Sequence, residues 1–118
     1  MQKPPLHTSF LNAFRGVAAM IKTERNFQIE LLAFFVNIFL IFYLHLSSID
    51  AVLILLVSIS VLSAEIFNTA IERICNIIQP DFDQRIGFIK DIAAGAVVLL
   101  AIAAIIVGVI IYPKYISI

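Results

Sequence analysis

The longest apolar run in the chain covers residues 92–112 and contains no formal charge. A bilayer core is about 30 Å thick and needs roughly 20 residues of helix to cross it, so this run predicts a membrane span. Two shorter apolar runs cover residues 31–46 and 51–64, and helical patterning continues from the second to Ile78. Backbone polar groups in lipid must be satisfied within the segment, which makes these spans helices.

Composition supports the same conclusion. Apolar residues make up 62% of the 118 residues and charged residues 14%, and eight basic residues balance eight acidic ones. A small soluble domain needs more charge on its surface, and a nucleic-acid binder needs an excess of basic residues. One cysteine excludes a disulfide framework. We expect a single all-α integral membrane domain over residues 1–118, with no nucleic-acid partner.

The segment before the first span has a different pattern. Phe10, Phe14, Val17 and Ile21 recur at helical spacing, and polar residues occupy other positions on the helix. This pattern predicts an amphipathic helix on the membrane surface over residues 8–26, approximately. The three spans are then expected at about 29–46, 50–78 and 90–112.

Basic residues predict the orientation. Four precede the first span, none lies between the first and second, three lie between the second and third, and one follows the third. The positive-inside rule therefore places the N-terminus in the cytoplasm and the C-terminus outside.

Polar residues mark one face of the second span. Glu65, Asn68 and Glu72 follow one another at spacings of three and four, so they share one face of the helix. Ionisable side chains in a bilayer cost several kcal/mol and indicate a functional site. If the helix enters the membrane at Asp50, Glu65 lies about 22 Å deeper, near the cytoplasmic edge of the hydrocarbon.

Other charges lie at the same depth. Glu24 and Glu30 precede the first span, and Lys90 and Asp91 precede the third. A transporter places its key charges near the midplane of the membrane. Charges gathered at one edge instead predict a reaction between a water-soluble reagent and a lipid headgroup.

Phosphoryl transfer suits these residue types. Magnesium typically binds one or two protein carboxylates together with substrate phosphates, and Glu24 and Glu72 fit that role. Lys90 is suited to offset charge on a transferred phosphoryl group, and Glu65 to accept a proton from a hydroxyl. The chain contains no glycine-rich phosphate loop. The alternatives are a small proton-coupled transporter subunit built around Glu65 and a non-catalytic scaffold.

Two motifs resemble those of a known family. The sequence AEIFNTAIE at residues 64–72 resembles the E-x-x-N-[ST]-A-I-E signature of the prokaryotic diacylglycerol kinase family, which includes undecaprenol kinases. The sequence KDIAAGAV at residues 90–97 resembles its second signature, K-D-x-x-[AS]-[AG]-A-V. Residues 14–16 and 24–27 are similar to the family's motifs in the surface helix and at the entry to the first span.

The resemblance implies a kinase of the bacterial inner membrane with its active site at the cytoplasmic face. It would use ATP and Mg²⁺ to phosphorylate diacylglycerol or undecaprenol, as a homotrimer whose neighbouring subunits share active sites. By motif, the implied site residues are Glu65 as proton acceptor, Asn68 as an orienting group, Glu24 and Glu72 as magnesium ligands, and Lys90 and Asp91 as nucleotide ligands.

The sequence departs from the family at three places. Residues 4–5 are prolines where some relatives have an arginine at the nucleotide site, Asn76 replaces a common aspartate, and Gly87 replaces an extra lysine. Residues 81–83 stand where relatives contact the nucleotide. Glu30 has two open interpretations, a structural role or a contact with the lipid headgroup.

Overall fold

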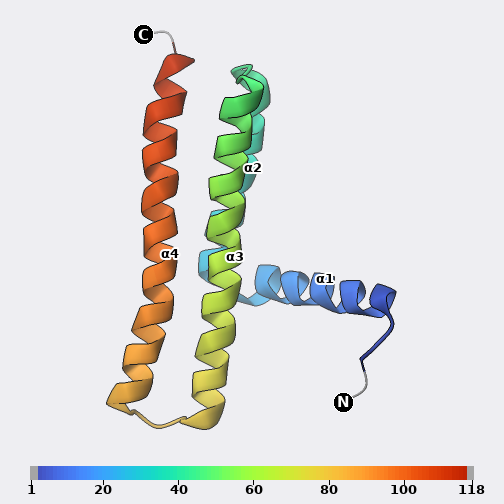
Figure 1. Ribbon diagram of the computed structural model, residues 1–118, viewed down its shortest axis with the longest axis vertical. Coiled ribbons are helices and arrows are strands. Elements are labelled where there is room, and N and C mark those ends of the chain that lie inside the picture. The colour runs from blue at the N-terminus through green and yellow to red at the C-terminus, as the bar shows by residue number, and fades with distance from the viewer. Residues whose placement is uncertain (1–2, 117–118) are drawn as a thin grey trace.

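The fold is all-helical, as expected. A computed structural model describes residues 3–116. Within these residues α2, α3 and α4 lie alongside one another, whereas α1 projects sideways from the bundle, roughly perpendicular to them (Figure 1). The helices are α1 (Leu6–Thr23), α2 (Arg25–Tyr43), α3 (Ser48–Ile78), α4 (Gln84–Ile111) and a short 3-10 turn, η1 (Tyr112–Lys114). The segments Arg25–Tyr43, Ser48–Ile78 and Gln84–Lys114 are long and apolar enough to cross a membrane.

Helix α1 begins and ends earlier than the approximate range 8–26. It starts at Leu6 directly after Pro5, which has a φ of −55° and fits the start of a helix. It ends because Glu24 adopts an extended conformation, with φ −108° and ψ 111°. The side chain of Gln28 donates a 2.8 Å hydrogen bond to the carbonyl of Ile21 and so satisfies one free carbonyl at this end of the helix. A single extended residue therefore separates α1 from α2.

The turn between α2 and α3 shortens the first span. Helix α2 stops at Tyr43, and His45 has a φ of 56°, in the left-handed region that interrupts a right-handed helix. Ser47 then caps α3, because its hydroxyl accepts a 3.3 Å hydrogen bond from the backbone N–H of Asp50. The turn and both helix ends are thus determined by local conformation.

Helix α3 is longer than a bilayer core requires. Its 31 residues extend about 46 Å at 1.5 Å per residue, compared with a hydrocarbon thickness of about 30 Å. Helix α4 begins at Gln84, earlier than residue 90, because the carboxylate of Asp83 accepts a 2.8 Å hydrogen bond from the N–H of Arg85 and caps the helix. The α3–α4 end of the bundle consequently extends beyond the level of α1 (Figure 1).

Polar side chains connect the helices near the end of the bundle that holds the α2–α3 turn and η1. Tyr112 donates a 2.6 Å hydrogen bond to the Oδ1 of Asn37, whose Nδ2 donates to the Oγ of Ser58 at 3.2 Å. At the end itself, Asp50 accepts a 2.6 Å hydrogen bond from Tyr115 and forms a 2.9 Å ion pair with Lys114. These contacts join α2, α3 and the segment after α4.

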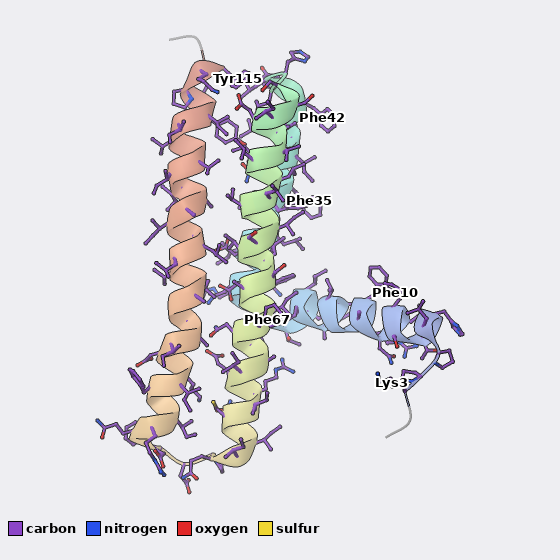
Figure 2. The ribbon with its side chains drawn as sticks, in the orientation of Figure 1. Lys3, Phe10, Phe35, Phe42, Phe67 and Tyr115 are labelled. Carbon is purple, nitrogen blue, oxygen red and sulfur yellow. The ribbon has the colours of Figure 1, made fainter. Side chains whose placement is uncertain are left out.

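Most of the apolar surface faces outwards. Phe35 and Phe42 project away from the bundle, and large apolar side chains are exposed on every helix from α1 to α4 (Figure 2). The few buried apolar residues include Phe27, Ile54 and Val61, each at most 3% exposed. Such a surface suits contact with lipid or with other membrane helices, and the fold is that of a membrane protein.

Candidate active site at the junction of α1, α2 and α3

The candidate site is organised around Glu65 on α3. The Glu65 side chain lies on the face of α3 that packs into the bundle, and only 6% of the residue is exposed. Thr69, one turn further on, is also buried, whereas Glu72 is exposed. The helical repeat therefore aligns a buried carboxylate with a solvent-exposed one, as the spacing predicts.

Three further carboxylates act electrostatically on Glu65. Glu30 of α2, Glu72 of α3 and Glu24 at the α1–α2 junction lie close enough for their charges to act on it. Only Glu72 could be related to Glu65 from local sequence spacing, because Glu30 lies on α2 and Glu24 lies between α1 and α2. The structure thus brings together Glu24, Glu65 and Glu72, and adds Glu30 to the same cluster.

Glu24 has a basic partner on α3. The Nη2 atom of Arg73 lies 2.9 Å from the Oε1 of Glu24, in an ion pair whose side chains are 59% and 32% exposed respectively. The same nitrogen lies 3.5 Å from the Oγ1 of Thr23. Because Arg73 belongs to α3, this pair ties the α1–α2 junction to the helix that carries Glu65 and Glu72.

These carboxylates suit a metal that is delivered with a phosphate ligand. Within residues 3–116 no group of three or more His, Cys, Asp or Glu side chains is arranged to hold a metal ion. Mg²⁺ needs fewer protein ligands, since it usually binds one or two carboxylates and completes its shell with water and phosphate oxygens. Glu24 and Glu72 provide two such hard oxygen donors, so the residues present fit magnesium bound to a nucleotide.

Lys90 contacts α3 across the bundle. Its Nζ donates a 2.7 Å hydrogen bond to the Oδ1 of Asn76, one turn beyond Glu72. Lys90 also lines a groove of about 370 Å³ beside the α3–α4 loop, together with Asp81 and Asp83. Hydrogen bonds from the Arg85 side chain and backbone N–H lower the pKa of Asp83 from its ordinary value to about 2.

Asp91 lines a different groove from Lys90. It is exposed, and Phe82, Gly87 and Phe88 line this groove with it. Consecutive residues of an α-helix point about 100° apart, so one of a neighbouring pair faces α3 and the other does not. The two residues of this motif therefore do not share one groove within a single chain.

Asn68 faces a groove between α3 and α4. This groove has a volume of about 400 Å³ and is mostly apolar, with Phe67 and Ala96 among its lining residues. The Oδ1 atom of Asn68 is buried and has no hydrogen-bond partner within residues 3–116. Buried acceptors usually have partners, so this oxygen is available to a ligand or to another chain.

The sequence did not identify Arg73 as a residue of the site. Its position predicts only a basic residue in the last turns of α3, and its partner Glu24 lies 49 positions away. Asn76 follows Glu72 by four residues and so shares the polar face of α3, but its bond to Lys90 likewise crosses between helices. No local spacing rule connects either pair.

Comparison with known proteins identifies the family of the chain. The model of the family described as prokaryotic diacylglycerol kinase matches residues 11–112. A diacylglycerol kinase of Synechocystis sp. is 38% identical over 106 residues, which cover 89% of this chain but only 61% of that relative. An undecaprenol kinase of Bacillus subtilis is 36% identical over 107 residues, which cover 90% of this chain and 87% of the relative. The chain belongs to the prokaryotic diacylglycerol kinase family.

Proposed function

We propose that this protein is a lipid kinase that transfers the γ-phosphoryl group of ATP to the hydroxyl of diacylglycerol or undecaprenol. The products would be ADP and either phosphatidic acid or undecaprenyl phosphate. The observation that carries the proposal is the cluster of carboxylates from α2, α3 and the α1–α2 junction around buried Glu65, in a chain of this family. The alternative of a proton-coupled transporter subunit built around Glu65 has no comparable support.

Glu65 is proposed to accept the proton of the lipid hydroxyl. As the proton leaves, the hydroxyl oxygen bonds to the γ-phosphorus, and the bond from that phosphorus to the β–γ bridging oxygen breaks to release ADP. A carboxylate is a suitable base when the hydroxyl is held within hydrogen-bond reach. Burial of Glu65 restricts its side chain, and Asn68 one turn away offers a free acceptor oxygen to orient the lipid headgroup.

The phosphate groups are proposed to lie between α3, α4 and the α1–α2 junction. Glu24 and Glu72 hold Mg²⁺, which when bound offsets the charge of the phosphates. Lys90 supplies a positive charge from α4, and its 2.7 Å bond to Asn76 orients the ammonium group towards α3. Asp91 is proposed to bind another part of the nucleotide.

We place the site at the cytoplasmic face of the bacterial inner membrane, with a cytoplasmic N-terminus. The distribution of basic residues supports this orientation. Helix α1 would lie on the membrane surface, because its exposed apolar residues include Phe10, Phe14 and Val17, and it runs roughly perpendicular to the spans (Figure 1). ATP would then reach the site from the cytoplasm while the lipid remains in the bilayer.

We also propose a homotrimer in which neighbouring subunits complete each site. Two features of the single chain support this proposal. Lys90 and Asp91 face different grooves, and the buried Oδ1 of Asn68 lacks a partner within residues 3–116. A neighbouring chain can supply what one chain leaves incomplete.

The test incubates purified protein in detergent micelles with γ-labelled ATP, Mg²⁺ and one lipid at a time. Transfer of label to diacylglycerol or undecaprenol is the expected result, and the preferred lipid identifies the substrate. The absence of lipid labelling would contradict the kinase. Proton flux in vesicles without any labelled lipid would support the transporter instead.

A further inference from the structure

We propose that Arg73 is a positioning residue that holds Glu24 as a metal ligand and thereby determines how tightly the site binds Mg²⁺. This inference rests on the proposed function, because it takes Glu24 and Glu72 as the magnesium carboxylates. It adds a residue of this chain that lies outside the signature residues Glu65, Asn68 and Glu72.

Glu24 lies at the break between helices α1 and α2. It is the single extended residue between α1 and α2, so the direction of its side chain depends on how two helices meet. Across residues 3–116, the side-chain hydrogen bonds that join this junction to α3 both come from Arg73, to Glu24 at 2.9 Å and to Thr23 at 3.5 Å. Arg73 therefore ties the junction to the helix that carries Glu72.

The contact leaves one oxygen of Glu24 available. Arg73 bonds to Oε1, and within the described residues Oε2 takes part in no hydrogen bond or ion pair. Carboxylates that ligate a metal are commonly held by a hydrogen bond to the other oxygen, and loss of that outer contact weakens metal binding. The arginine thus orients Glu24 without occupying the oxygen that a metal needs.

The charge of Arg73 also suits this position. The charges of Glu24, Glu30 and Glu72 all act on Glu65, and without a cation these carboxylates repel one another. Arg73 contacts Glu24, so its guanidinium places a positive charge directly on one of the two proposed ligands. Exposed ion pairs contribute little to stability, so a variant without this pair should still fold.

The experiment compares wild type with Arg73→Gln and Arg73→Lys. Activity is measured against Mg²⁺ concentration at saturating ATP and lipid. We expect Arg73→Gln to raise the Mg²⁺ concentration for half-maximal activity by about tenfold, with kcat at saturating Mg²⁺ nearly unchanged. Arg73→Lys keeps the charge and one donor and should stay within about threefold of wild type. Arg85→Gln is the matched control, because it removes an exposed arginine from another ion pair at the same end of the bundle.

A second measurement needs no turnover. Binding of Mn²⁺ in the presence of a non-hydrolysable ATP analogue is followed by electron paramagnetic resonance, and Arg73→Gln should weaken it by about tenfold. In a Glu24→Gln background the same Arg73→Gln change should have no further effect, because Arg73 acts through Glu24. Circular dichroism confirms that each variant is folded.

An unchanged metal affinity in Arg73→Gln would overturn the proposal. A higher affinity would overturn it too, because it would mean that Arg73 competes with the metal. So would an Arg73→Gln change that weakens metal binding equally with Glu24 present and in the Glu24→Gln background. Failure of the proposed function has a different signature, since wild-type protein would then phosphorylate no lipid at any Mg²⁺ concentration. If Arg73→Gln does not fold, the test uses Arg73→Lys, which is expected to bind Mn²⁺ almost as tightly as wild type. A folded Arg73→Lys that binds Mn²⁺ as weakly as Glu24→Gln does would contradict the proposal.

Discussion

Replacing Glu65 by glutamine removes one negative charge and leaves the size of the side chain almost unchanged. The residue is only 6% exposed, so the amide should occupy the same position. A positioned general base typically contributes about 10²- to 10⁴-fold to a rate. At 1.36 kcal/mol per tenfold, this corresponds to an increase of about 2.7 to 5.4 kcal/mol in the activation barrier.

The same substitution should preserve the fold and the binding of nucleotide. Glu24, Glu30 and Glu72 act electrostatically on Glu65, so removing its charge lowers repulsion within the cluster. The ion pair between Glu24 and Arg73 does not involve Glu65 and stays intact. We therefore expect kcat to fall while the KM for ATP and the requirement for Mg²⁺ remain close to those of the wild type.

The assay measures transfer of the γ-phosphoryl group from labelled ATP to lipid in micelles, and binding of the Mg²⁺-nucleotide is measured in parallel. Near-normal kcat in Glu65→Gln would refute the assignment of Glu65 as the base. A parallel loss of nucleotide binding would refute the separation of roles, because it would place Glu65 in the metal site. Thermal unfolding by circular dichroism verifies that the comparison is between folded proteins.

Three further predictions concern single side chains. Glu72→Gln should raise the Mg²⁺ requirement by about tenfold or more, and an unchanged Mg²⁺ titration would remove Glu72 from the metal site. Tyr112→Phe deletes a 2.6 Å hydrogen bond to Asn37 and should lower the free energy of unfolding in micelles by about 0.6 to 1.7 kcal/mol, whereas an unaltered SDS-unfolding curve would show that the bond contributes nothing. Asp83 has a pKa of about 2 because Arg85 donates hydrogen bonds to it. A carboxyl whose folded pKa lies below its unfolded value of about 4 stabilises the protein above that value and loses this effect as the pH falls towards 2. Wild type and Asp83→Asn should therefore differ in melting temperature at neutral pH and converge between about pH 4 and 2; a constant difference over that range would contradict the assignment.

The membrane spans could be predicted from the sequence because hydrophobicity along one helix is a local property. The charge-free run at residues 92–112 predicts a span whatever its neighbours are, and α4 contains nearly all of it. Helix ends were less predictable. Asp83 extends α4 by capping it, and the positive φ of His45 stops α2 early, and both are effects of individual residues that hydropathy does not reveal.

Within the site, the sequence predicted what a single helix can align. Glu65, Asn68 and Glu72 lie on one side of α3 because residues three and four apart are neighbours on any α-helix. The same rule gives no information about Asp91, whose direction differs from that of Lys90 because α4 meets α3 along one side only.

By itself the sequence determined the three membrane spans, because hydropathy along each helix is a local property. It also determined that Glu65 and Glu72 share one face of the second span, because this follows from spacing along one helix. Only the tertiary structure decided that Arg73 pairs with Glu24, that Lys90 bonds to Asn76, and that Glu30 joins the acidic cluster. These contacts depend on how separate helices pack and on where the chain breaks at Glu24. Pairing across tens of residues is a property of that packing, and no short-range pattern encodes it.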